Sequence, residues 1–247
     1  MALRDYFHAL LDLFYPRYCL HCNAHLNDSQ ELYLCPYCKK TLAFIQNDHC
    51  RRCGTALGPH ITPTIHEGCP ACRDKYLYFD TITSITRYDG VIKTLIHKFK
   101  YARQTFVVSS LNNIVAMQTQ FKETLADIDI IVPVPLFWLK KFHRGFNQSE
   151  LLSVGIQRHI SKPISRNNLY RIKNTVSQTQ LSRTQRQANV HNAFFVKNPI
   201  LFKGKKILLV DDVLTTGVTA SECSKKLKES GAESVHVFVL AKAEYHT

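Results

Sequence analysis

One short string constrains the fold of this chain more than any other part of it. Residues 207–219 read ILLVDDVLTTGVT: an apolar run, two adjacent carboxylates, a loop of Thr and Gly, and then a helical pattern. Continuous branched apolar runs are typical of buried parallel strands, whereas half-buried strands alternate. Ligands of open α/β sheets bind just beyond the carboxyl ends of such strands. We therefore expect the apolar run to end at Asp211 and Asp212, on the rim of a binding site.

The loop after the two carboxylates has the chemistry of an anion site. Thr215, Thr216 and Thr219 offer hydroxyls, Gly217 permits a positive φ, and a helix N-terminus offers backbone N–H groups. Carboxylates beside a phosphate repel it unless they bind hydroxyls instead. A phosphorylated ribose carries both groups, so the string predicts a nucleotide-sugar site. The simpler alternative is a buried strand followed by an Asp-rich turn that caps a helix.

The rest of the C-terminal part predicts further elements of one α/β sheet. Strands are expected at residues 81–88, 129–134 and 234–240, and helices at 91–100, 106–121 and 149–159. Residues 219–222 (Thr-Ala-Ser-Glu) predict a capping box for the helix after the Thr-Gly loop. The 129–134 run ends in Pro-Val-Pro, and a basic loop with Lys140, Lys141, Arg144 and Gly145 follows it. This loop is interpreted as a second anion site, or else as an ordinary Lys-rich surface loop.

The charge of the chain is unevenly divided. Residues 1–80 hold eight Lys/Arg and eight Asp/Glu, whereas residues 81–247 hold 24 and 11. The whole formal net charge of +13 therefore lies in the C-terminal part. A basic surface favours phosphorylated small molecules or nucleic acid, and the competing interpretation is charge that serves solubility. Residues 174–196 are polar and carry Arg, which fits a mobile lid over a phosphate or a solvated connection.

Four C-x-x-C pairs define the N-terminal part. Eight of the nine cysteines form them: Cys19/Cys22, Cys35/Cys38, Cys50/Cys53 and Cys69/Cys72. Two pairs close a tetrahedral four-thiolate site, so we predict two structural Zn²⁺ sites. The pairs combine sequentially, as two zinc ribbons in tandem, or interleaved, and disulfides are the alternative that a reducing compartment disfavours. Cys223 is expected to be an inert core thiol.

Two levels of resemblance follow from these motifs. Residues 210–217 resemble the motif with which type I phosphoribosyltransferases bind phosphoribosyl pyrophosphate (PRPP). Nearly the whole chain resembles the ComF family, phosphoribosyltransferase-like proteins linked to bacterial competence. That resemblance rests on the cysteine pairs, on the Lys-Tyr that ends residues 92–101, and on the motifs at 132–135, 144–148, 179–189 and 210–217.

The resemblance implies roles for individual residues. Asp211 and Asp212 would contact the ribose hydroxyls, with Mg²⁺ bridging ribose and pyrophosphate. The implied PRPP-binding residues are Val213, Leu214, Thr215, Thr216, Gly217, Thr219, Val134, Pro135, Lys140, Lys141 and Arg144. Several purine-salvage members carry a further Asp just before Thr-Gly, and Thr215 stands there in this chain. Purine salvage is therefore disfavoured.

The sequence thus predicts a type I phosphoribosyltransferase-like α/β domain at residues 79–247, with a Rossmann-like parallel sheet. Residues 1–78 are expected to hold an N-terminal helix and the double zinc ribbon. No stretch has the length and apolarity of a membrane span, and a cytoplasmic protein is expected. The resemblance implies a role in DNA uptake with competence-machinery proteins as partners, and the positive charge of residues 81–247 adds single-stranded DNA as an expected partner. An active nucleobase phosphoribosyltransferase of salvage metabolism is the alternative.

Overall fold

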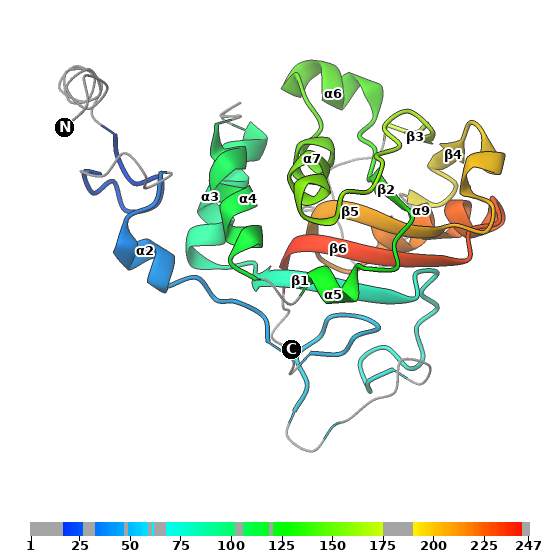
Figure 1. Ribbon diagram of the computed structural model, residues 1–247, viewed down its shortest axis with the longest axis horizontal. Helices are drawn as coiled ribbons and strands as arrows, with labels where there is room; N and C mark the ends of the chain where they lie inside the picture. The colour runs from blue at the N-terminus through cyan, green and yellow to red at the C-terminus, as the bar shows by residue number, and fades with distance from the viewer. Residues whose placement is uncertain are drawn as a thin grey trace.

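A parallel sheet forms the centre of the computed structural model, which describes residues 17–26, 33–46, 49–58, 61, 68–101, 106–118, 121–174 and 190–243. Within these residues four parallel strands follow the order β1-β6-β5-β2 (Figure 1). They are β1 (Thr81–Arg87), β2 (Ile130–Pro133), β5 (Lys206–Leu214) and β6 (Ser234–Lys242). The middle strands β5 and β6 are buried along almost their whole length, as their apolar runs require. The predicted parallel α/β sheet is confirmed.

Helices cover both faces of the sheet, and the sheet separates two hydrophobic cores. On one face lie α3 (Gly90–Tyr101), α4 (Val107–Ala116) and α7 (Gln148–Ile160), and on the other lies α9 (Val218–Glu229) (Figure 1). Alternate residues of β5 serve the two cores, because successive side chains of a strand point to opposite faces. Leu208 and Val210 join the first core, and Ile207 and Leu209 join the second.

Shorter elements lie around the two ends of the sheet. They are α5 (Phe121–Thr124), α6 (Trp138–Arg144), β3 (Leu169–Arg171), β4 (Phe194–Val196) and the 3₁₀ helix η2 (Pro199–Phe202). Strands β3 and β4 pair antiparallel as a separate two-stranded sheet. None of the helices in the described ranges is both long and apolar enough to cross a bilayer.

The two cysteine-rich segments attach to the sheet in different ways. The first contains α2 (Pro36–Lys40), and its buried residues Leu26, Leu34 and Leu42 belong to the same core as α3. The second has a small cluster of its own and meets the edge of β1, where the Ile82 N–H donates to the Arg51 carbonyl at 2.9 Å. The first segment is thus built into the main core, whereas the second rests on the sheet edge.

Three local expectations are wrong. Strand β5 does not end at the carboxylates but continues through Asp211 and Asp212 to Leu214, because β6 pairs with it as far as Lys242. The basic loop after β2 folds largely into α6, which Gly145 ends in the left-handed conformation at φ 85°. Helix α9 begins at Val218 with Gly217 as its N-cap, so the capping box does not form.

Two other expectations fall on residues outside the described ranges. The helix expected near the N-terminus lies within residues 1–16, and most of the expected lid lies within residues 175–189. The helix expected at 106–121 is described as α4 followed by the short α5.

Candidate functional site

The candidate site lies where β5 carries its two carboxylates to the carboxyl end of the sheet. Asp211 pairs with Val239 in the parallel register, so the neighbouring strand β6 fixes its position. Asp212 is 6 % exposed, and Asp211 is half-buried. Two carboxylates on adjacent residues of a buried strand would destabilise the fold without compensating groups, since burial and mutual repulsion both disfavour their charges.

Helix α3 supplies the compensating cation. The Lys100 Nζ lies 2.8 Å from Asp212 Oδ2, and the two side chains are largely buried. Burial alone would lower the pKa of Lys100, but Asp212 and then Asp211 raise it above its ordinary value. Lys100 is therefore a permanent ammonium, and it neutralises one of the two acidic charges of the site.

Asp211 is held by hydrogen bonds from two donors. The Ser149 hydroxyl donates to Asp211 Oδ1 at 3.1 Å, and the Asp212 backbone N–H donates to the same oxygen at 2.9 Å. Burial and the adjacent Asp212 carboxylate raise the pKa of Asp211 to about 7, although Lys100 and these two hydrogen bonds act in the opposite direction. Asp211 therefore exchanges a proton near neutral pH, as groups in functional clefts often do.

The loop after β5 forms a turn that leads directly into α9. Gly217 has φ 79°, a left-handed conformation that residues with a Cβ rarely adopt, and the Ser221 N–H donates to its carbonyl at 2.8 Å. Among the described residues, the buried Thr216 hydroxyl oxygen has no hydrogen-bond partner. A buried hydroxyl without a partner is costly, and a bound polar group would satisfy it. The loop therefore fits the expected phosphate site.

The second predicted anion segment lies beside the first, because β2 pairs with β5. The Val134 N–H donates to the Val210 carbonyl at 2.9 Å, and the Asn147 side-chain amide donates to the Val134 carbonyl at 3.0 Å. The Asn147 side-chain oxygen Oδ1 accepts a hydrogen bond from the Ser149 backbone N–H and so caps α7. The adjacent Pro135 is half-buried. This network fixes Ser149, the residue that binds Asp211.

The basic residues of this segment lie on α6 and have different surroundings. The Lys141 Nζ lies 2.8 Å from Glu150 Oε1 on the first turn of α7. Burial, Arg171 and Arg144 lower the pKa of Lys140, so these cations lie close to one another. The role of Lys140, Lys141 and Arg144 toward pyrophosphate stays a prediction.

Three residues of the site have no predicted role in the sequence analysis. Lys100 enters there only as the end of an expected helix and in the Lys-Tyr of the family resemblance, and Ser149 only as the start of another helix. Arg171 on β3 lies near enough to Asp211 to interact with its charge, and burial lowers the pKa of its guanidinium. Each comes from a different element, and only the assembled sheet brings them to β5. The Lys-Tyr at 100–101 was the one signal for Lys100.

The cysteines form two sequential tetrads. Cys19, Cys22, Cys35 and Cys38 make one, and Cys50, Cys53, Cys69 and Cys72 make the other, with all sulfurs of a tetrad within 4.8 Å of one another. Neighbouring sulfurs lie 3.6 Å (Cys53–Cys69) to 3.9 Å (Cys50–Cys72) apart. Four sulfurs at about 2.3 Å from a tetrahedral Zn²⁺ have this spacing, so the donor sets fit zinc. The tandem pairing is the one present, and Cys223 is a separate buried thiol.

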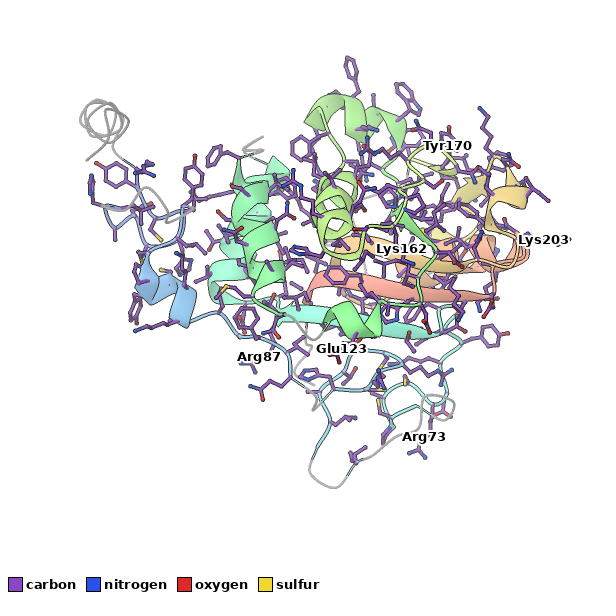
Figure 2. All side chains as sticks on the ribbon, viewed as in Figure 1. Arg73, Arg87, Glu123, Lys162, Tyr170 and Lys203 are labelled. Atoms are coloured by element: carbon purple, nitrogen blue, oxygen red, sulfur yellow. The ribbon has the colours of Figure 1, made fainter. Side chains whose placement is uncertain are left out.

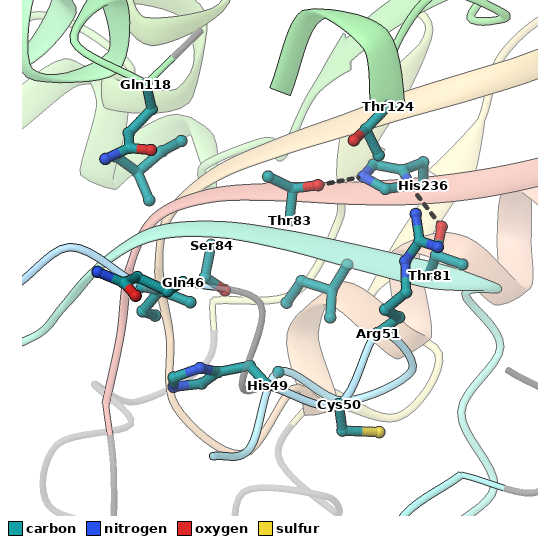
Figure 3. A pocket seen from close by; sticks show the side chains of 14 residues that line it. Gln46, His49, Cys50, Arg51, Thr81, Thr83, Ser84, Gln118, Thr124 and His236 are labelled. Carbon is teal, nitrogen blue, oxygen red and sulfur yellow. Dashed lines mark hydrogen bonds between the residues drawn. The ribbon is translucent and has the colours of Figure 1, made fainter. Parts of the chain in front are cut away.

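A cavity of about 610 Å³ lies apart from the carboxylate site, between the second tetrad and β1 (Figure 3). His236 stands inside it, bonded to the hydroxyls of Thr81 and Thr83, the latter at 2.9 Å (Figure 3). Burial and then the nearby Arg51 guanidinium lower the pKa of His236 to about 4. His236 is therefore a neutral, buried side chain of the central strand β6 at physiological pH.

Comparison with family models agrees with both halves of the structure. Residues 10–74 match the double zinc ribbon domain, and residues 140–246 match the phosphoribosyl transferase domain. With the parallel sheet and the two tetrads, these matches define the class: a type I phosphoribosyltransferase fold with an N-terminal double zinc ribbon.

Sequence similarity to named proteins assigns the chain to one family within this class. The chain is 31% identical to competence protein F of Haemophilus influenzae, covering 91% of this chain and 96% of that protein. It is 29% identical to DNA utilization protein YhgH of Escherichia coli K12, covering 85% and 96%. It is 26% identical to competence protein ComFC of Bacillus subtilis, covering 85% and 84%. This chain belongs to the competence protein F (ComF) family.

Proposed function

We propose that this chain binds PRPP with Mg²⁺ at the carboxyl end of β5. One observation carries the proposal: two carboxylates on a buried strand lead into a turn where the buried Thr216 hydroxyl has no partner among the described residues. Asp211 and Asp212 would accept hydrogen bonds from the ribose hydroxyls. The hydroxyls and N–H groups of Thr215 to Gly217, at the start of α9, would bind the 5′ phosphate. Mg²⁺ would neutralise the pyrophosphate charge when bound.

The internal contacts of the two carboxylates define what binding must change. Asp212 is paired with Lys100, and Asp211 accepts from Ser149. A ribose hydroxyl that donates to Asp212 must share that carboxylate with the Lys100 ammonium or displace it. Positive charge brought by Mg²⁺ would favour the ionised form of Asp211, whose pKa is raised to about 7.

The test is a thermal shift titration of the full chain with PRPP and Mg²⁺. At one hundred times Kd, ligand binding stabilises by about 2.7 kcal/mol, which raises Tm by roughly 5–10 °C for a chain of this size. Asp212→Asn should abolish the shift. Asp129→Asn is the matched control, because Asp129 accepts from the Lys206 N–H at the opposite end of β5. No shift in the parent chain, or an equal shift in Asp212→Asn, overturns the proposal.

We propose in addition that the site serves DNA uptake on the cytoplasmic side of the membrane. Two relatives are named competence proteins and another a DNA utilization protein, which supports this role. Eight thiols in zinc-fitting tetrads support a reducing compartment. Single-stranded DNA is the proposed polyanion, in accord with the +13 charge, and proteins of the competence machinery are proposed as partners.

Catalytic transfer is the second candidate function, and the titration of Asp211 favours it. The Asp211 side chain, in its ionised form, would stabilise the positive charge that develops on the ribose as pyrophosphate leaves. Pyrophosphate release from PRPP and Mg²⁺, measured with DNA, with free nucleobases and alone, tests it. Release that depends on a nucleobase would favour salvage, whereas the Thr215 position disfavours purines. PRPP binding without release in any mixture excludes this second candidate and leaves the first intact.

A further inference from the structure

The positive charge of the chain is concentrated in one stretch of sequence. Residues 130–210 contain 14 Lys and Arg but one acidic residue, Glu150. That stretch alone carries the full +13, and the remainder of the chain is balanced. Within the described residues, α6 and the end of β3 carry cations near the carboxyl end of the sheet (Figure 1): Lys140, Lys141, Arg144 and Arg171. Lys203, Lys205 and Lys206 instead lie at or just before the start of β5, at the opposite end of the sheet. The surface formed by α6 and β3 is therefore basic.

The same region exposes two pairs of aromatic rings. Trp138 is 66 % exposed and Phe142 is 78 % exposed, and they lie four residues apart on α6, on one side of the helix. Tyr170 on β3 is directly opposite Phe195 on β4 in the antiparallel register, so these rings share one face of the two-stranded sheet. They are 38 % and 52 % exposed. We call these four residues the aromatic platform.

The two pairs belong to one structural unit. A backbone bridge joins Phe137, the N-cap of α6, to Arg171 of β3. Trp138 and Tyr170 are the immediate chain neighbours of these two residues. The Phe137 and Trp138 rings lie 5.6 Å apart, and the Arg171 guanidinium lies 5.6 Å from the Phe194 ring behind the hairpin. Figure 2 shows Tyr170 on the edge beneath α6, while Arg73 of the second cysteine segment lies at the opposite end of the molecule.

We infer that the aromatic platform is a stacking surface for the unpaired bases of single-stranded DNA. Exposed rings interleaved with cations are the chemistry of single-strand binding, because every base offers a π-face and every nucleotide a phosphate. Trp138, Phe142, Tyr170 and Phe195 would stack on bases, while the surrounding Lys and Arg contact phosphates. The inference rests on the proposed role in DNA handling and gives it a location. It also places the bound DNA strand beside Arg171, whose charge interacts with that of Asp211.

Other occupants fit this surface less well. A second copy would bring two copies of this basic surface of α6 and β3 together in a two-fold interface, which repulsion opposes. Duplex DNA keeps its bases paired and stacked, so it would contact the cations but leave the rings in water. An anionic membrane surface would also contact exposed rings beside cations, and the vesicle titration below distinguishes it from single-stranded DNA.

The chain contains its own reporter for this contact, because Trp138 is its single tryptophan. Titration of the full chain with a 20-nucleotide oligothymidylate should quench Trp138 fluorescence as bases stack on the indole. An abasic oligomer of equal length carries the phosphates without bases and should not quench it. A duplex of equal length and anionic phospholipid vesicles complete the set. Quenching or a blue shift with vesicles but not with oligothymidylate would assign the surface to membranes and overturn the inference.

Variants test the affinity independently of fluorescence. Anisotropy of a labelled oligothymidylate should show that Trp138→Ala/Phe142→Ala weakens binding by about 30-fold or more, since each stacked ring contributes at least about fivefold. Trp138→Phe keeps a ring and should bind within about threefold of the parent. Tyr37→Ala is the matched control, because Tyr37 is 75 % exposed on α2 in the first cysteine segment. Its affinity should equal that of the parent.

The outcomes separate this inference from the proposed function. Binding of oligothymidylate without quenching, together with unchanged affinity in Trp138→Ala/Phe142→Ala, overturns the platform and leaves DNA binding intact. Loss of affinity in Tyr37→Ala instead would move the contact to the cysteine-rich part. Failure of the parent chain to bind at low salt overturns both the platform and the DNA role, while the thermal shift with PRPP still decides the PRPP site.

Discussion

The Lys100 Nζ lies 2.8 Å from Asp212 Oδ2, and this contact joins the last turn of α3 to the strand that carries the candidate site. The pair neutralises one carboxylate and leaves Asp211 to titrate near pH 7. It also means that Asp212 is already occupied by a cation before any ligand binds. The site is therefore not an open pair of carboxylates: Asp212 is in an ion pair, and burial and Asp212 raise the pKa of Asp211 to about 7.

Removal of the Lys100 ammonium should destabilise the chain. Lys100→Met keeps the length of the side chain but leaves Asp212 buried without its cation, which costs about 3 kcal/mol in the free energy of unfolding. Urea unfolding of the parent and the variant measures this loss. Lys100→Met/Asp212→Asn removes both charges and should recover most of it. A double variant as unstable as Lys100→Met would show that packing, rather than charge, is responsible.

Asp211 should make the chain less stable as pH rises toward neutrality. Its pKa is about 7 in the folded chain and about 3.9 when unfolded, so between these values the folded chain holds the extra proton. The free energy of unfolding should therefore fall from about pH 4 to pH 7. Asp211→Asn lacks this titration, and unfolding at pH 5 and pH 7.5 should show its stability rising relative to the parent by about 2 kcal/mol. Parallel profiles would contradict the raised pKa.

His236 should change the pH dependence of the free energy of unfolding in the opposite direction to Asp211. Its pKa is about 4 in the folded chain and about 6.5 when unfolded, so the unfolded chain binds the extra proton between these values. Its contribution to stability is present above about pH 6.5 and is lost as pH falls to about 4. His236→Gln retains hydrogen-bonding groups toward Thr81 and Thr83 and should lose less stability than the parent on acidification, by about 3 kcal/mol. Equal losses would place the titrating group elsewhere.

The two tetrads should release zinc independently. The parent chain should contain two zinc ions, and Cys38→Ala and Cys72→Ala should each contain one, as measured by metal analysis of the purified protein. Cys38→Ala should lower Tm further, because Cys38 belongs to the core that contains α3 whereas Cys72 belongs to a separate small cluster. Cys223→Ala is the control and should keep both ions. One shared ion, or two in every variant, would contradict the tandem tetrads.

Gly155 allows α7 to lie close to α4. A Cβ at Gly155 would stand 2.0 Å from Asn112 Oδ1, so Gly155→Ala should cost about 2 kcal/mol in the free energy of unfolding. Asn112→Ala/Gly155→Ala removes the obstruction and should be at least as stable as Asn112→Ala, because Ala is the better helix former. Chemical unfolding of the three variants checks this. A double variant less stable than both single ones would show that the helices meet differently.

Sequence patterns identified the elements that depend on local rules. The buried strands follow from their apolar runs, and the tetrads follow from the C-x-x-C spacing. The predicted end of β5 was wrong, because pairing with β6 extends the strand through Asp211 and Asp212. No local sequence pattern reveals that pairing. Helix α6 was mistaken for a loop because it is only seven residues long, four of them are basic or His, and none of its side chains is buried in the core.

The contacts that set the charge of the site were beyond sequence reasoning for a different reason. Lys100, Ser149 and Arg171 are separated from Asp211 by between 40 and 111 positions in the chain. Each is ordinary in its local context, and only the assembly of α3, α7 and β3 around β5 brings them together. The residue types of the site were predictable, whereas their protonation was not.

Helix α3 connects two parts of the molecule that have been described separately. Near its start, the Thr94 hydroxyl lies 3.0 Å from His21 Nδ1 in the first cysteine segment, and its apolar side packs with Cys35 and Cys38. At its other end it presents Lys100 to Asp212. One continuous helix of twelve residues thus contacts the first cysteine segment and also carries the counter-ion of Asp212, so the packing around the first tetrad helps to set the position of Lys100.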